Sequence, residues 1–329
     1  MQTLSVRPHK MSIAALQIDN LPTPKEETWK YTNLPRAIPA DLKEAAGEDI
    51  VIHKNSGEVC EQIEDILFTA ADGQRTAPVL KITLERGAQM TLIERQQGEG
   101  AYWKNMRTEI TLAEGAILNH IRISDDSMQA VNTNMVSVSV ERDSVYNGFS
   151  LNIGGKLTRH EIDAVMNGQN AELHFNGVNL LNGTQHGDTT ILVKHMAPHC
   201  NSNQFYRNLI DESAKCVFQG KVYVDQIAQK TDGYQLSNTL LLSEKAEMDT
   251  KPELEIYADD VKCSHGSTCG QLDEEPLFYL RQRGIPETEA RLLLVQAFVD
   301  EVVDKIVNED IKEQILQRTN AWLMAALKK

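Results

Sequence analysis

Residues 85–92 read ERGAQMTL, in which a glycine-containing turn and a small residue lead into alternating apolar positions. A polar turn, a small residue and alternation return at EGAIL (114–118), RDSVY (142–146), QNAELHF (169–175), ESAKCVF (212–218) and EKAEM (244–248). The small residues stand at positions 88, 116, 144, 171, 214 and 246, so the steps are 28, 28, 27, 43 and 32 residues. A β-rich repeat of this length is typical of one coil of a solenoid, whose coils stack by parallel strand pairing. The sequence therefore predicts a mainly β protein with a right-handed parallel β-helix core.

The segments between these turns have the period of β-strands. Apolar and polar residues alternate in VLKITL at 79–84, VSVSV at 136–140 and KVYV at 221–224. A β-sandwich of evenly spaced hairpins is the alternative, but it would repeat roughly every 16 to 24 residues. The longer steps favour the β-helix, and the long fourth step predicts an insertion or an irregular coil near residues 182–206.

Composition excludes several classes of protein. The net charge of -14 opposes binding to nucleic acid, because contacts to the phosphate backbone rely on Lys and Arg. No apolar run approaches the roughly 18 to 20 residues that cross a membrane, and residues 1–30 lack the apolar core of a signal peptide. We therefore expect a cytoplasmic protein. The five scattered cysteines fit neither a disulfide framework nor a zinc ribbon.

The chain divides into three regions. Residues 1–48 hold five of the ten prolines and are expected to form an N-terminal arm with short helices. We expect Trp29 and Tyr31 to anchor this arm to the protein's own body. Residues 49–270 are assigned to the β-helix and residues 271–329 to a C-terminal helical region.

The C-terminal region carries the signals of three helices. Asp273 is expected to cap a first helix that ends at Gly284, and Pro286 begins a longer one. A third helix is expected from about residue 310 to Leu327. The second helix has an apolar face wider than a solvent-facing helix needs. That face covers the third helix, and its excess suggests a partner protein.

The usual catalytic motifs are absent: there is no phosphate-binding loop, dinucleotide-binding glycine motif, HExxH or GxSxG. HMAPHC at 195–200 offers two imidazoles and a thiol to a metal. In an extended strand, however, His195 and His199 would stand about 13 Å apart, too far for one ion without a turn. This metal site is disfavoured. RHE at 159–161 and QHGD at 185–188 are expected at polar outer positions of the coils.

The segment KCSHGSTCG at 262–270 is a stronger candidate. Cys263 and His265 are two positions apart, so in a strand both point to the same side. Thiolate and imidazole are ligands of iron–sulfur clusters. The alternative is a glycine-rich exit from the last coil in which both side chains merely pack.

Several segments resemble the SufB/SufD family of iron–sulfur cluster assembly proteins, in its SufD form. The most specific are PELEI at 252–256, DDVKCSHG at 259–266, GQLDEE at 270–275 and FYLRQRGI at 278–285. Weaker ones are EETWKYT at 26–32, FQGK at 218–221, QKTD at 229–232 and NTLLLS at 238–243. The chain is shorter than the usual member of this type, and the loss falls in the N-terminal helical region.

The resemblance implies a non-catalytic scaffold subunit of an ATPase-driven cytosolic complex with SufB and the ATPase SufC. SufC would dock on the C-terminal helices, where we expect contacts from Phe298, Val302, Leu294 and Val295. SufB would pair with the end of the β-helix. A transient iron–sulfur cluster shared with SufB would form at this interface beside His265, which is the expected shared metal ligand, with Cys263 as a neighbour.

The resemblance also implies reduced flavin in some complexes of this type, while no cofactor is expected in the isolated chain. A homodimer in isolation is left open. A SufB-like scaffold is the alternative within the family. Outside it, a carbohydrate-active β-helix enzyme would need a ladder of acids that is not visible. A metal-dependent enzyme would use His195, His199 and Cys200.

Overall fold

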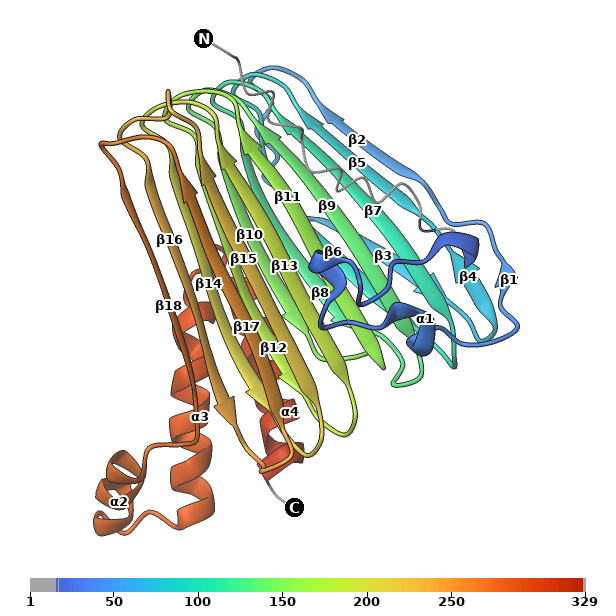
Figure 1. Ribbon diagram of the computed structural model, residues 1–329, viewed down its shortest axis with the longest axis vertical. Coiled ribbons are helices and arrows are strands. Elements are labelled where there is room, and N and C mark those ends of the chain that lie inside the picture. The colour runs from blue at the N-terminus through green and yellow to red at the C-terminus, as the bar shows by residue number, and fades with distance from the viewer. Residues whose placement is uncertain (1–15, 17, 328–329) are drawn as a thin grey trace.

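The computed structural model describes Leu16 and residues 18–327, and its strands build a parallel β-helix (Figure 1). Within these residues the strands form two sheets, and every pairing of strands within them is parallel. The first sheet holds β1 (Lys43–Glu44), β2 (Ile50–Lys54), β4 (Gln74–Thr76), β5 (Val79–Leu84), β7 (Trp103–Leu112), β9 (Val131–Val140), β11 (Leu157–Met166), β13 (His186–His195), β15 (Lys215–Val224) and β17 (Glu247–Ile256). The second sheet holds β3 (Glu64–Ala70), β6 (Gln89–Gly98), β8 (Ile117–Asp125), β10 (Val145–Asn152), β12 (Glu172–Leu181), β14 (Asn201–Ile210), β16 (Asp232–Leu241) and β18 (Lys262–Gly270). From β6 onward consecutive strands alternate between the sheets, so the predicted parallel β-helix is confirmed.

One row of aliphatic side chains shows why the coils stack in register. The row occupies paired positions on successive strands of the first sheet: Ile82, Ile110, Val138, Ala164, Val193 and Val222. All six side chains are buried inside the β-helix. Burying a valine or isoleucine side chain contributes about 1.5 to 3 kcal/mol, and a slip by one residue would turn the whole row to the outer face of the sheet.

The turns that lead into the second sheet repeat one backbone conformation. The residue two positions before the strand has a positive φ, as at Gly87 (+68°), Asn170 (+58°) and His199 (+62°). Glycine and asparagine tolerate this left-handed conformation better than most residues. The following residue is small and buried, as at Ala88. This recurring corner is the pattern that the sequence displays.

The expected insertion near residues 182–206 is wrong. This range holds β13 and the first part of β14, and both strands pair in unbroken register with their neighbours. Each coil has two corners, and the small residue before the second sheet is Cys200 in this coil. Ala214 belongs to the opposite corner, before β15. The 43-residue step therefore runs from a corner before the second sheet to a corner before the first sheet, and it does not measure one coil.

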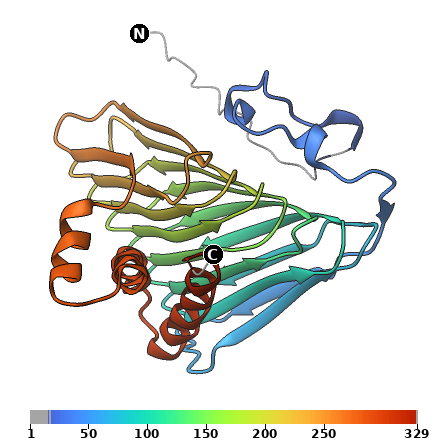
Figure 2. The same cartoon turned by 90° about the horizontal axis from the view of Figure 1, so that it is seen from below.

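The C-terminal helices are α2 (Glu274–Gln282), α3 (Glu287–Val303) and α4 (Glu309–Leu327). Asp273 caps α2 by accepting a hydrogen bond from the Glu275 backbone N–H at 3.0 Å, as expected. Helices α3 and α4 cover the outer face of the second sheet, where Val299 and Ile315 join a buried cluster with Leu180 and Phe205 (Figures 1 and 2). Much of the broad apolar face of α3 is thus used within the chain. The side chain of Leu327 lies outside the described residues.

The N-terminal arm crosses the outer face of the first sheet (Figure 2). Its elements are η1 (Ile18–Asn20), η2 (Glu27–Trp29) and α1 (Leu34–Ala37). Trp29 is buried in a cluster with Trp103, Val131 and Leu157, so the expected anchoring by Trp29 is confirmed. The part of the arm at residues 1–15 lies outside the described residues. Among the helices of the described chain, none is long and apolar enough to cross a membrane.

Candidate functional site

The C-terminal end of the β-helix is open. Strands β17 and β18 are the last in their sheets, and no described strand pairs with their outer edges (Figure 1). The free edge of a strand presents backbone N–H and C=O groups that another chain can pair with. Proteins usually cover or break such an edge, so two exposed edges side by side suggest an interface.

Strand β18 places Cys263 and His265 on the inner face of this open coil. Cys263 pairs in register with Gly233, and His265 pairs with the buried Gln235. The two side chains therefore point to the same side, as the spacing predicted. His265 is exposed and Cys263 is half-buried, because the thiol packs in a cluster with Val222 and Leu254.

Burial raises the pKa of the Cys263 thiol, and the backbone hydrogen bond to Gly233 offsets this only in part. The neighbouring Lys262 has the opposite side-chain direction in the strand and does not reverse the effect. The thiol is therefore less ready than the exposed His265 imidazole to act as a ligand in the isolated chain.

The described residues contain no group of three or more His, Cys, Asp or Glu side chains that could hold a metal ion. His265 and Cys263 would supply two ligands, so a metal or cluster at this edge needs further ligands from another molecule. A four-ligand site is the usual requirement for iron–sulfur clusters.

The structure does not bring His195, His199 and Cys200 together. His195 is buried inside the β-helix, 2.8 Å from the Ser202 hydroxyl, and burial lowers its pKa to about 4. His199 forms the corner, and the Cys200 thiol donates a hydrogen bond to the Gly168 carbonyl at 3.3 Å. These side chains serve the coil corner.

The expectation for residues 159–161 and 185–188 is corrected in part. Arg159 and Asp188 do face outward from the coil, but the N-terminal arm buries both. The Arg159 guanidinium lies 3.9 Å from the Trp29 ring and also pairs with Asp188. His160 points the other way, into the interior. A segment distant in sequence thus converts outer polar positions into a buried contact.

The interior of the first coils holds a buried charged network that sequence reasoning missed. The Glu94 carboxylate lies 3.1 Å from His120 Nε2 and 3.5 Å from Arg122 Nε, and all three side chains are buried. Burial would raise the pKa of Glu94, but the hydrogen bond with His120 and the charges of His120 and Arg122 hold it below its usual value. Lys104 and Asp126 form a second buried pair at 2.9 Å.

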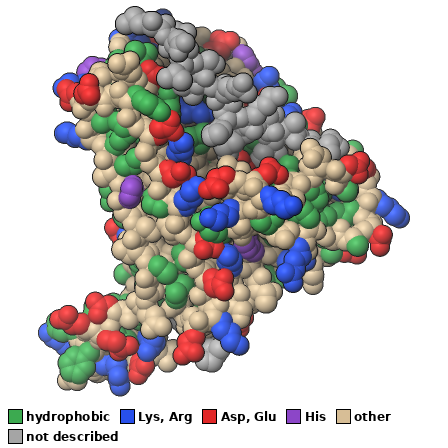
Figure 3. Space-filling view, in the orientation of Figure 1, with side chains coloured by type: hydrophobic (Ala, Val, Ile, Leu, Met, Phe, Trp, Pro, Cys, Tyr) green, Lys and Arg blue, Asp and Glu red, His purple; other side chains and the backbone are tan. Residues whose placement is uncertain are grey.

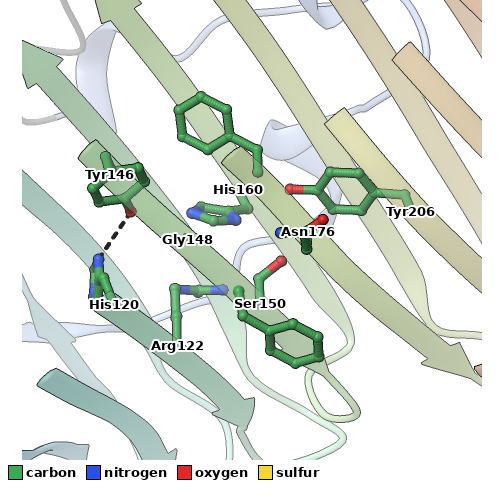
Figure 4. Close-up of a pocket in the computed structure, with 10 residues that line it drawn as sticks. His120, Arg122, Tyr146, Gly148, Ser150, His160, Asn176 and Tyr206 are labelled. Carbon is green, nitrogen blue, oxygen red and sulfur yellow. Dashed lines mark hydrogen bonds between the residues drawn. The ribbon is translucent and has the colours of Figure 1, made fainter. Parts of the chain in front are cut away.

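A small cavity borders this network (Figure 4). Arg122, Ser150 and His160 surround it, and the His120 Nδ1 atom lies 3.1 Å from the Tyr146 hydroxyl at its edge. Its volume of about 10 Å³ admits one water-sized group. The cavity is too small for a flavin or a cluster, so the interior network is structural in character.

The helices offer a separate exposed surface. Phe278 and Tyr279 on α2 are 62% and 57% exposed, and Leu293 on α3 is 43% exposed. The lobe formed by α2 projects from the β-helix and mixes hydrophobic with charged side chains (Figure 3). Of the predicted contact residues, Val295 and Val302 are fully buried, whereas Leu294 and Phe298 are half-buried. Val295 and Val302 cannot touch a partner while α3 rests on the sheet.

The chain is similar to proteins of iron–sulfur cluster assembly. The family model described as "SUF system FeS cluster assembly, SufBD core domain" matches residues 67–298. An iron–sulfur cluster assembly SufBD family protein of Synechocystis is 37% identical over 73% of this chain and 55% of that protein. The iron–sulfur cluster assembly protein SufD of Escherichia coli is 35% identical over 72% of this chain and 56% of that protein. The chloroplastic protein ABCI7 of Arabidopsis thaliana is 33% identical over 72% of this chain and 51% of that protein.

The chain spans about half the length of the curated relatives it matches. The matched family region begins within β3 and ends within α3, so it includes every strand from β4 to β18 and the open coil with His265. A family model that matches residues 67–298, together with relatives that are more than 30% identical over about 72% of this chain, settles the family. The chain belongs to the SufBD core family of the SUF system for iron–sulfur cluster assembly.

Proposed function

We propose that this chain is a SufD-like scaffold subunit that supports the formation of a nascent iron–sulfur cluster at an interface with SufB. The observation that carries the proposal is the position of His265: exposed, on the inner face of the last coil, beside two free strand edges. The E. coli relative named SufD supports the assignment to the SufD form.

A shared site follows from the ligand count. His265 would supply one ligand and Cys263 a second, and the partner would complete the set by pairing with the edge of β17 or β18. The cluster is cargo that leaves the complex, and the chain itself would catalyse no reaction. We assign reduced flavin to no site on this chain. The cytoplasmic location expected from the sequence belongs to the same proposal.

The ATPase SufC would dock on the exposed surface of α2 and α3. We move the predicted contact away from the buried Val295 and Val302 to Phe278, Tyr279 and Leu293. Aromatic side chains that are exposed on a projecting lobe are typical of a protein contact. Phe278→Asp with Tyr279→Asp is expected to reduce co-purification with SufC at least tenfold. Val51→Asp is the control, because Val51 is also exposed but lies in the first coils.

The decisive test is anaerobic reconstitution of the complex with SufB and SufC, followed by the visible absorption of the cluster. His265→Ala should abolish most cluster formation while leaving the complex assembled. Ser264→Ala is the matched control, since Ser264 is its exposed neighbour with the opposite side-chain direction. Equal cluster yields for His265→Ala and Ser264→Ala would refute the proposal.

A further inference from the structure

Two buried glutamines lie directly behind His265. Gln204, Gln235 and His265 occupy paired positions on the parallel strands β14, β16 and β18. Gln204 and Gln235 are 0% and 1% exposed, and both point into the interior. His265 ends this row at the open coil, one strand spacing of about 4.8 Å from Gln235.

The two amides are unsatisfied among the described residues. Neither the nitrogen nor the oxygen of either amide has a hydrogen-bond partner. A buried polar group without a partner is costly, and such groups in folded proteins are nearly always paired. The exposed His265 imidazole also makes no hydrogen bond within the described part of the chain. The row therefore has unused donors and acceptors at three successive positions.

Gly220 on β15 brings the two amides together. A Cβ atom at Gly220 would lie 2.8 Å from Gln204 Oε1 and 3.1 Å from Gln235 Nε2, so both atoms face the space that the missing side chain leaves. The Gln235 amide nitrogen and the Gln204 amide oxygen make no hydrogen bond as they stand, but they face the same space, so a small rotation of one side chain would join them. The Gln235 oxygen then remains for the next position of the row.

A neighbouring row on the same sheet already forms such a ladder. Asn152 Nδ2 donates to Asn179 Oδ1 at 3.3 Å, and Asn179 Nδ2 donates to Asn208 Oδ1 at 2.8 Å. Asn208 Nδ2 donates in turn to the Thr239 hydroxyl at 3.1 Å. In-register parallel strands favour ladders of identical amides. The interior of this β-helix thus supports hydrogen bonding along its axis as far as β16.

We propose that Gln235 is a positioning residue for His265: its amide oxygen accepts the imidazole N–H, and its amide nitrogen donates to Gln204. The bond at one ring nitrogen fixes the tautomer and orientation of the ring. The other ring nitrogen keeps its lone pair and faces the open edge, ready to act as a ligand. The importance of this arrangement for cluster assembly rests on the proposed function of His265.

The tautomer of His265 tests the proposal directly. Long-range proton–nitrogen NMR spectra of the full chain with ¹⁵N-labelled histidine report the two ring nitrogens, and His265→Ala identifies the signals. The wild type and Gln235→Glu, whose carboxylate also accepts an N–H, should show one dominant tautomer. Gln235→Met should return the ratio to that of free imidazole. Gln204→Met removes only the acceptor of the Gln235 amide nitrogen, so it should weaken the dominant tautomer less than Gln235→Met does.

A free-imidazole ratio in the wild type, or an unchanged ratio in Gln235→Met, would overturn the proposal. In the reconstituted complex Gln235→Met should slow cluster formation about tenfold, as for other residues that orient a metal ligand. Loss of assembly in His265→Ala without any tautomer change in Gln235→Met removes only this inference. A tautomer change with full assembly in His265→Ala supports the contact and removes only the proposed function.

Discussion

The environment of each histidine decides what it can do. His195 is buried with Ser202 as its partner, and burial lowers its pKa to about 4. It therefore stays neutral near pH 7 and serves packing. His265 stands exposed at the open edge, where a ligand can reach it. Residue type alone made both of them candidates, and burial separates their roles.

The buried His195 predicts a pH-dependent stability. The unfolded chain protonates this histidine below about pH 6.5, whereas the folded chain does so only near pH 4. The contribution of the neutral His195 to the free energy of unfolding is complete above about pH 6.5, and it is lost as the pH falls from about 6.5 to about 4. The loss amounts to about 3 kcal/mol in the free energy of unfolding. Urea unfolding at pH 7 and pH 4.5 should show a smaller difference for His195→Gln than for the wild type.

Replacement of the exposed His53 by Gln is the control, because its side chain is half exposed on β2. The loss of stability between pH 7 and pH 4.5 should be reduced less by His53→Gln than by His195→Gln. A His195→Gln protein that loses as much stability between the two pH values as the wild type contradicts the assignment.

For the buried charged network, the sequence could predict which side chains point inward, but it could not predict which of them contact one another. Glu94 shares its parity in β6 with the buried Met90 and Leu92, so alternation alone places it inside. Its partner His120 comes from the next coil. Which charges meet depends on the register between strands, and a single strand does not carry that information.

At the scale of the elements, the broad face of α3 finds its partner in the second sheet. Val295, Val299 and Val302 are buried beside sheet residues such as Leu180. The period of the helix was visible in the sequence, together with its caps. The surface that it covers was not, because the outer face of the sheet forms only when separate coils align.

This packing predicts different effects for two aliphatic residues of the same helix. Val302→Ala should lower the free energy of unfolding by about 2 kcal/mol, because it removes two buried methyl groups and leaves a cavity. Leu293→Ala should change it by less than about 0.5 kcal/mol, since that side chain is exposed. Denaturant unfolding compares the two. Equal losses would mean that α3 does not rest on the sheet in solution.

The repeat shows the limit of prediction at the corners of the coils. Positive φ values at Gly87, Asn170 and His199 belong to equivalent corners, although these residue types differ. Glycine and asparagine announce such a turn in a sequence, and histidine does not. The coil at residues 182–206 was therefore misread as irregular, while the coils before it were predicted correctly.

At the scale of the whole molecule, both outer faces of the β-helix are covered by other parts of the chain, whereas its C-terminal end is open. The arm covers the first sheet and the helices cover the second (Figure 2). Lys251 on β17 pairs with Glu27 of the arm at 2.7 Å, a contact between positions 224 residues apart. Such long-range contacts have no local signal in the sequence. The C-terminal end remains uncovered among the described residues.

The open end predicts association through the strand edge. The Lys262 backbone N–H bonds to Thr231 in the preceding turn, so N–H groups at odd-numbered residues of β18 point away from β16. Ser267→Pro removes one outward N–H without breaking the inner ladder. We expect the isolated chain to dimerise through this edge, and sedimentation velocity should show the dimer weakened at least tenfold by Ser267→Pro. Ser267→Ala keeps the N–H and should dimerise like the wild type. A dimer that survives Ser267→Pro uses another surface, and a wild type that stays monomeric at all concentrations contradicts self-pairing.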